Sequence, residues 1–246
     1  MNRVLRPSPA GNGLRYCGEA TPETLIPSIG GYGPKTTQMT PRASLEAALD
    51  DAASLFDSFR RDPTSLARMT DFAEIALTTF QRGGRLLACG NGGSLAQAMH
   101  FAEEWTGRFR RDRRALPAMA LADPSVITCI ANDFGYEAVF ARQIEAHGRR
   151  GDLLLAISTS GRSPNLLRAA SAARKFDMTT VALLGKGGGP LAGEVDIPIV
   201  VPRATTSDRI QEVHLVILHA VIEAVERQIF PEIYADPQTE PGDTPD

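Results

Sequence analysis

The chain has 246 residues, 43% of them hydrophobic, and its 26 basic and 29 acidic residues leave a formal net charge of −3. This length and composition suit one sizeable domain with a hydrophobic core and unpacked ends. A weakly acidic chain lacks the bulk positive charge that attracts nucleic acid or an anionic membrane, so we expect neither as a partner.

The cysteines Cys17, Cys89 and Cys129 are odd in number, far apart and without a CxxC pair. They therefore predict neither a disulfide framework nor a thiolate zinc site, in keeping with a reducing compartment. No apolar run approaches the ~20 residues of a membrane-spanning helix, and the first residues do not resemble a secretory signal. We expect a soluble cytoplasmic protein.

A cluster of five arginines lies between Arg108 and Arg114. Asp112 interrupts the cluster, and Phe109 is the one aromatic residue within it. Nucleic-acid sites interleave basic with several aromatic residues, so the pattern favours a solvated surface face.

The two ends of the chain differ in composition from its centre. Residues 1–40 are rich in Pro, Gly, Ser and Thr without a sustained apolar period, which predicts a disordered or loosely packed extension. Residues 236–246 contain prolines and acidic residues, which predicts a disordered acidic tail. The folded domain is expected at 41–235.

Two helices are predicted at the start of this domain, each with apolar residues at helical spacing. Ser44 is expected to cap the first helix, which continues to Phe59. Asp62-Pro63 ends it, and Pro63 suits the first turn of the second helix, which Gly83-Gly84 ends.

Strands and helices then alternate along the chain. Short apolar strands are predicted at 85–89, 117–121, 152–157, 179–184 and 197–201. Helices are predicted at 94–108, 125–132, 136–147, 165–176 and 207–230. This rhythm predicts an α/β fold with a doubly wound, five-stranded parallel sheet flanked by helices and preceded by a helical hairpin.

Two segments that follow strands are rich in glycine and hydroxyl residues, CGNGGS at 89–94 and STSGRS at 158–163. Glycines let a backbone approach a ligand closely, and the start of the next helix presents free N–H groups to a phosphate. Either segment alone is also typical of an ordinary turn or helix cap. Two of them at the carboxyl ends of strands, where ligands of such sheets bind, favour a phosphate site. The lysine of GKGGG at 185–189 precedes its glycines, which indicates a turn and not a nucleotide loop.

Three of the four histidines lie on two of the predicted helices. His100 and Glu104 share one helix face and can converge on one ion. Gln211 and His219 lie about two turns apart on the last helix and can also point the same way. Imidazole and carboxylate groups are usual zinc ligands, and they also transfer protons near neutral pH. A structural role is the simpler interpretation of the other two histidines, His147 and His214.

Four segments resemble the phosphoheptose isomerases, a branch of the sugar isomerase (SIS) domain proteins. They are CGNGGS at 89–94, AMHFAEEWTGRF at 98–109, the segment 131–165 and SDRIQEVHLVILHAVIE at 207–223. The resemblance extends from about Ser44 to Phe230 and implies the flavodoxin-like SIS fold. It also implies an aldose–ketose isomerase of heptose biosynthesis, which interconverts D-sedoheptulose 7-phosphate and D-glycero-D-manno-heptose 7-phosphate through an enediol.

The resemblance further implies a role for individual residues. The substrate contacts would be Asn91, Gly92, Gly93, Ser94, Glu104, Asn132, Asp133, Ser158, Thr159, Ser160, Ser163 and Gln211. One Zn²⁺ per subunit would be held by His100, Glu104, Gln211 and His219. Glu104 and His219 would also form the acid–base pair, and the subunits would assemble as a homotetramer whose sites share residues.

Three alternatives stay open. Non-catalytic SIS proteins of the DnaA initiator-associating type are similar in the CGNG and RIQE segments, but they lack the acid–base pair at Glu104 and His219. SIS-type regulators carry a DNA-binding domain, for which the first 40 residues are too short and irregular. The fold also serves isomerases of other sugar phosphates.

Overall fold

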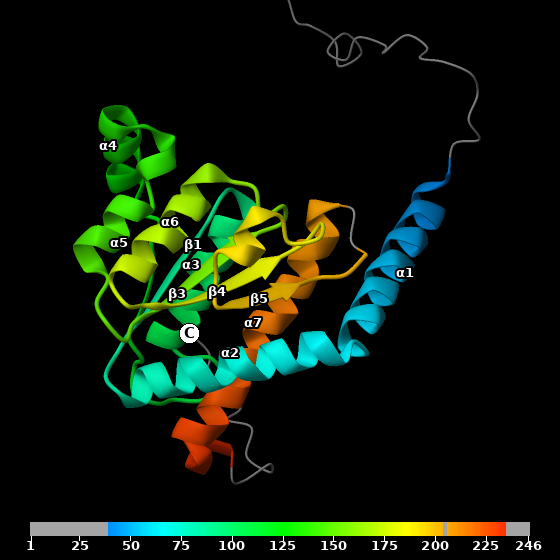
Figure 1. Cartoon of the computed structure of the whole chain (residues 1–246). Helices are drawn as coiled ribbons and strands as arrows, with labels where there is room; N and C mark the ends of the chain where they lie inside the picture. Colours follow the sequence, from blue (N-terminus) through cyan, green and yellow to red (C-terminus); the bar gives the residue numbers. More distant parts are fainter. Residues whose placement is uncertain (1–38, 204–205, 235–246) are drawn as a thin grey trace, which may run out of the picture. The chain divides into compact units, whose positions relative to one another are not determined.

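The computed structural model describes residues 39–203 and 206–234 (Figure 1). The extension predicted at 1–40, apart from residues 39 and 40, and the tail predicted at 236–246 lie outside the described residues. The chain divides into two units, Met1–Pro41 and Arg42–Asp246, and the elements below belong to the second apart from Pro41, the first residue of the first helix. Within the described ranges, no helix is both long and apolar enough to cross a membrane.

A five-stranded parallel sheet lies at the centre of the domain, which confirms the predicted fold class. The strands are β1 (Leu86–Gly90), β2 (Ala118–Ala120), β3 (Leu153–Ser158), β4 (Thr179–Leu184) and β5 (Ile197–Val200). Their order across the sheet is β2-β1-β3-β4-β5. The chain leaves β1 toward one edge and later returns to β3 on its other side, so the topological switch point lies between β1 and β3.

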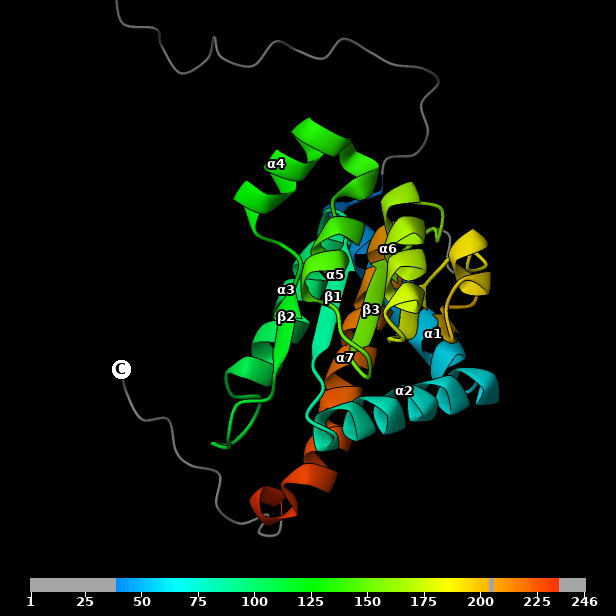
Figure 2. The same cartoon turned by 60° about the vertical axis from the view of Figure 1, so that its left-hand side comes forward.

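Helices cover both faces of this sheet (Figures 1 and 2). The α-helices are α1 (Pro41–Arg60), α2 (Pro63–Gln81), α3 (Gly93–Thr106), α4 (Pro124–Phe134), α5 (Ala141–His147), α6 (Pro164–Lys175) and α7 (Ser207–Ile229). Single turns of 3₁₀ helix are η2 (Tyr136–Ala138), η3 (Pro190–Gly193) and η4 (Pro231–Tyr234).

The core has two halves, one on each face of the sheet, and β3 shows why. Its residues are all buried, with Leu153, Leu155 and Ile157 in one half and Leu154 and Ala156 in the other. The first half joins the sheet to α2, α3 and α7, and the second joins it to α4, α5 and α6. Alternate side chains of a strand point to opposite faces, so a strand buried on both faces is apolar throughout.

Three predictions about element ends and exposure were wrong. The first helix begins at Pro41, so Ser44 lies inside it and is not its cap. The helix predicted at 136–147 is divided into η2 and α5, because Val139 and Phe140 form a turn that buries both side chains. The arginine cluster is not solvated throughout, since the Arg113 side chain is only 1% exposed.

His214 on α7 is buried and bonded, as expected of a structural histidine. It is 0% exposed, and its Nε2 lies 3.2 Å from the carbonyl oxygen of Leu184 at the end of β4. Burial away from water disfavours the charged imidazole and lowers the pKa of His214 to about 4, against a small opposing effect of the Leu184 hydrogen bond.

His214 should therefore make the fold sensitive to acid. Its imidazole takes up a proton near pH 6.5 in the unfolded chain but only near pH 4 in the folded chain. Between these values the unfolded state binds more protons, so stability falls as pH falls, by up to about 3 kcal/mol. Denaturant unfolding at one protein concentration, followed by fluorescence of the single tryptophan Trp105, should show this loss.

A His214→Gln variant can still donate to Leu184 but does not titrate. It should be less dependent on pH between 6.5 and 4 than the wild type, whereas His147→Gln, at the exposed end of α5, should keep the wild-type dependence. An unchanged slope in His214→Gln would contradict this assignment.

Candidate functional site

The loop after β1 brings backbone to the switch point at close range. Gly92 has a φ of 55°, a conformation that favours glycine, and α3 begins at the next residue. A Cβ on Gly93 would lie 2.7 Å from Nε2 of Gln211 on α7, so any side chain at this position would displace that amide. The N–H groups of Ser94 and Leu95 donate to the carbonyls of Asn91 and Gly92 at 3.1 and 2.9 Å, so what the start of α3 offers an anion is chiefly the positive end of its dipole.

The loop after β3 is built around hydroxyl groups, as its sequence indicates. Ser158 is buried and its Oγ accepts from the backbone N–H of Gly161 at 3.0 Å. Ser160 Oγ accepts from the N–H of Arg162 at 3.3 Å, and Thr159 Oγ1 lies 3.1 Å from Ser207 Oγ on α7. The loop leads into the 12-residue helix α6, whose N-terminus is a positive dipole end, although Pro164 in its first turn lacks an N–H and the N–H of Leu166 donates to the Ser163 carbonyl at 3.1 Å.

Two asparagines join these loops across the switch point. Asn91 Nδ2 donates to Asn165 Oδ1 at 3.0 Å, and Asn165 Nδ2 donates to Asn91 Oδ1 at 2.8 Å. The hydroxyl of Tyr136 also donates to Asn91 Oδ1 at 2.8 Å. Sequence analysis did not identify Asn165 or Tyr136, because neither partner is near Asn91 in the chain.

Three of the four predicted metal ligands meet where α3 packs against α7. The Nε2 atoms of His100 and His219 are 2.9 Å apart, and His100 Nε2 lies 3.5 Å from Glu104 Oε1. One ligand atom from each of the three residues falls within 4.8 Å of the others. Such mutual distances suit donors that surround one ion.

Glu103 sets the orientation of the first imidazole. Its Oε1 lies 3.0 Å from His100 Nδ1, so a proton on Nδ1 leaves Nε2 as a lone pair facing the cluster. A carboxylate behind the far nitrogen of an imidazole is the usual arrangement around metal-bound histidine. The donor set therefore fits a Zn²⁺ ion.

The surroundings move the pKa values of two cluster members in opposite directions. Burial is the largest cause that raises the pKa of Glu104, followed by the negative charge of Glu103. Burial is also the largest cause that lowers the pKa of His219, followed by His100 and Arg110. Less water around both groups favours a neutral imidazole and makes the carboxylate a stronger base.

The other predicted site residues lie at different distances from this cluster. The Gln211 amide contacts Gly93 beside the first loop, and its backbone oxygen accepts from Gln97 at 2.7 Å. Asn132 and Asp133 are exposed on α4, where Asn132 donates to Asp133 at 2.7 Å. In both views α4 stands out from the layers that contain α3 and α7 (Figures 1 and 2).

Known proteins share this sequence and this fold. Residues 49–185 match the SIS domain family. A phosphoheptose isomerase of Fusobacterium nucleatum is 54% identical over 157 residues, 64% of this chain and 80% of that protein. One of Vibrio cholerae serotype O1 is 45% identical over 185 residues, 75% of this chain and 97% of that protein.

A solved structure leads to the same family. The phosphoheptose isomerase from Neisseria gonorrhoeae superposes with a TM-score of 0.71 at 37% identity, over 76% of this chain and 99% of that one. Identity of this level over nearly the whole of these proteins identifies the family. The chain belongs to the phosphoheptose isomerases of the SIS domain family and is therefore an isomerase.

Proposed function

We propose that the chain interconverts D-sedoheptulose 7-phosphate and D-glycero-D-manno-heptose 7-phosphate, as a step of heptose biosynthesis. The observation that carries this proposal is the convergence of His100, Glu104 and His219 on one point, in a chain of this family. In the direction from the ketose to the aldose, the C1–H bond breaks and a C2–H bond forms, while a hydroxyl proton moves from O1 to O2. The reaction needs no external oxidant, because C1 is oxidised as C2 is reduced.

The phosphate is assigned to the loop after β3. Four hydroxyls, of Ser158, Thr159, Ser160 and Ser163, and the first turn of α6 would bind its oxygens. The loop after β1, Asn91 to Ser94, would line the sugar. Asn132 and Asp133 would contact the sugar end, supplied by a neighbouring copy of the chain, since α4 stands away from the cluster of its own copy.

A Zn²⁺ ion is the proposed cofactor, one per subunit. His100, Glu104 and His219 would hold it. The amide of Gln211, which in this structure lies beside Gly93, is proposed as the fourth ligand on the strength of the family resemblance. When bound, zinc polarises the carbonyl and stabilises negative charge on the oxygens of the enediol.

Glu104 and His219 are proposed as the acid–base pair. Glu104 has a raised pKa and His219 a lowered one, which makes a carboxylate better able to take a carbon-bound proton and leaves a neutral imidazole near neutral pH. One group would handle the proton on carbon while the other handles the proton on oxygen. This pair also distinguishes an enzyme from the non-catalytic DnaA initiator-associating proteins.

Turnover of a panel of sugar phosphates tests the reaction. The wild type should convert sedoheptulose 7-phosphate to an aldoheptose phosphate. Glu104→Gln should reduce kcat by about 10²–10⁴-fold, because a positioned acid or base contributes that much. Glu74→Gln, which neutralises an exposed carboxylate on α2, is the matched control and should leave kcat unchanged.

Two outcomes would contradict the proposal. Turnover of a pentose or amino-sugar phosphate in place of the heptose would indicate an isomerase of another substrate, and no turnover of any would favour a binding protein. Wild-type kcat in Glu104→Gln would remove this residue from the acid–base pair.

Metal removal tests the cofactor. Dialysis against EDTA should abolish turnover and zinc should restore it, with one zinc ion per chain by elemental analysis. His100→Ala should weaken zinc binding by more than about 100-fold, since even residues behind the ligands contribute 10- to 100-fold. His147→Ala, which removes the exposed imidazole at the end of α5, should keep wild-type affinity. Full activity in metal-free protein would exclude the zinc site.

Assembly into a homotetramer is part of the proposal. α1 exposes Leu45 by 66% and Leu49 by 70%, and Val216 on α7 is 43% exposed. Exposed apolar residues in a row along one helix are typical of an interface, and a second copy of this chain is the occupant we propose.

Light scattering after size exclusion should therefore give the mass of four chains. Leu49→Asp should lower that mass, because it places a charge in the interface. Ala47→Asp adds the same charge to another face of α1 and should leave the mass unchanged. A monomeric wild type, or a tetrameric Leu49→Asp variant, would contradict the interface.

A further inference from the structure

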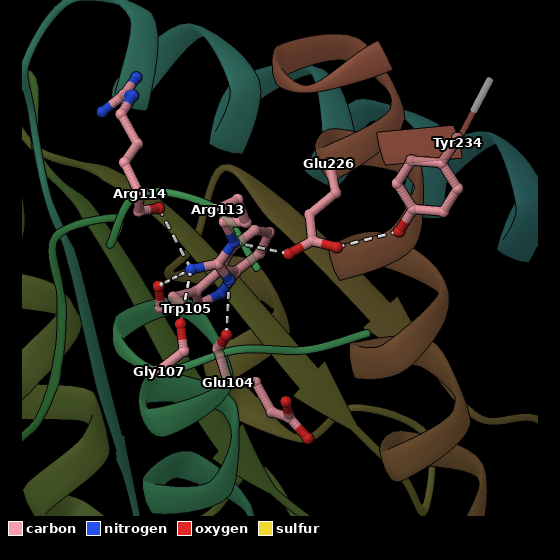
Figure 3. Close-up of polar contacts among 7 residues, drawn as sticks. All are labelled: Glu104, Trp105, Gly107, Arg113, Arg114, Glu226 and Tyr234. Carbon is pink, nitrogen blue, oxygen red and sulfur yellow. Dashed lines mark hydrogen bonds and ion pairs between the residues drawn. The ribbon is translucent and has the colours of Figure 1, made fainter. Parts of the chain in front are cut away.

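A buried ion pair lies beneath the metal-ligand cluster, outside the residues assigned above. Arg113 Nε donates to Glu226 Oε1 at 2.8 Å, and the two side chains are 1% and 0% exposed (Figure 3). The second oxygen, Glu226 Oε2, accepts from the hydroxyl of Tyr234 in η4 at 2.9 Å. Both oxygens of this buried carboxylate are thus hydrogen-bonded within the protein.

The rest of the Arg113 guanidinium binds the end of α3. Nη2 donates to the carbonyl oxygen of Glu104 at 2.7 Å, and Nη1 donates to the carbonyl oxygens of Trp105 and Gly107 at 2.8 and 2.9 Å (Figure 3). A longer contact of 3.3 Å reaches the carbonyl of Arg114. The last carbonyls of a helix have no hydrogen-bond donor within the helix, and here one side chain donates to three of them.

Stability alone does not account for this arrangement. Well-packed apolar residues can replace a buried ion pair at little or no cost, since both charges must be stripped of water. Apolar residues could not, however, donate to three carbonyls in one plane. A planar guanidinium fork does so with little loss of freedom, so the distinctive property of Arg113 is the geometry it imposes on the end of α3.

Both ends of this contact belong to the helices that carry the proposed site. Glu104 contributes its carbonyl to Arg113 and its carboxylate to the cluster with His100. Glu226 lies seven residues after His219 on α7, about two turns along the same face. The pair therefore joins α3 to α7 close to the point where their side chains meet.

We propose that Arg113, held by Glu226, is a positioning residue of the isomerase site that fixes the last turn of α3 against α7 and so places the Glu104 carboxylate. This inference rests on the role of Glu104 in the proposed function. The Arg113 side chain is buried, at 1% exposed, and it would act through the backbone of Glu104, to which it donates.

The decisive variant is the double substitution Arg113→Met with Glu226→Leu. It removes both charges together, which avoids an unpaired buried ion. It also removes the Arg113 donor from the carbonyls of Glu104, Trp105 and Gly107, of which Trp105 keeps the N–H of Leu116 at 3.0 Å. We expect kcat to fall by roughly 10- to 100-fold, because small misplacement of a catalytic group has that effect. KM should change by less than about threefold, because the phosphate loops are not altered.

A matched control replaces another arginine–glutamate pair in the same way. Arg174 on α6 and Glu194 after η3 form an exposed ion pair away from α3 and α7. Arg174→Met with Glu194→Leu should keep the wild-type kcat and KM. A folded Arg113→Met/Glu226→Leu protein with wild-type kcat would overturn the proposal.

Arg113→Lys decides the question if the double variant does not fold. Lysine keeps a cation against Glu226 but lacks the planar fork, so kcat should still fall with little change in KM. Wild-type kcat in a folded Arg113→Lys protein would overturn the positioning role.

Amide hydrogen exchange separates this inference from the proposed function. Absence of turnover in the wild type would refute the isomerase reaction, whereas exchange at Trp105, Thr106 and Gly107 reports on α3 whatever the substrate. These amides should exchange faster in the Arg113 variants than in the wild type or the Arg174 control. Equal exchange in all four proteins would refute the fixation of α3 even if the enzyme is active.

Discussion

The packing of α3 against α7 is the contact on which the candidate site depends. His100 and His219 are 119 residues apart in the chain, yet their Nε2 atoms lie 2.9 Å from each other. Two unprotonated imidazole nitrogens at this distance would repel, so either a shared proton or a cation between them is needed. The apolar contacts beneath, among Phe101, Ile217 and Leu218, hold the helices together and make that polar approach possible.

A single helix links the two halves of the proposed chemistry. α3 begins at Gly93, in the loop at the switch point, and carries His100 seven residues later, about 10 Å along its axis. That spacing is comparable to the length of an extended seven-carbon sugar phosphate. A phosphate bound near the switch point would thus leave the carbonyl end of the sugar near the cluster. The distance from Gly93 to His100 along α3 would then match the length of the substrate.

Features that depend on local pattern could be predicted from the sequence. The strands are short apolar runs, and the spacing of His100 and Glu104 alone places both on one helix face. Features that depend on distant partners could not. No residue near Arg113 in the sequence indicates that Glu226, 113 residues later, pairs with it in the interior. The arginine-rich segment around Arg113 therefore suggested a solvated face. The Asn91–Asn165 pair could not be predicted either, because its two members are 74 residues apart in the chain.

Partial burial accounts for the shifted pKa values in the cluster, and partial exposure means that its side chains must be positioned by the backbone. Removing water raises the pKa of Glu104 and lowers that of His219, so one physical cause would suit both groups to the proton transfer proposed for them. The site must nevertheless admit a sugar, and the side chains of His100 and Glu104 stay 36% and 15% exposed. Side chains that stay partly exposed are not packed on every side. Their precision must come from the backbone that carries them, and at the end of α3 that backbone is held by a side chain that is itself fully buried.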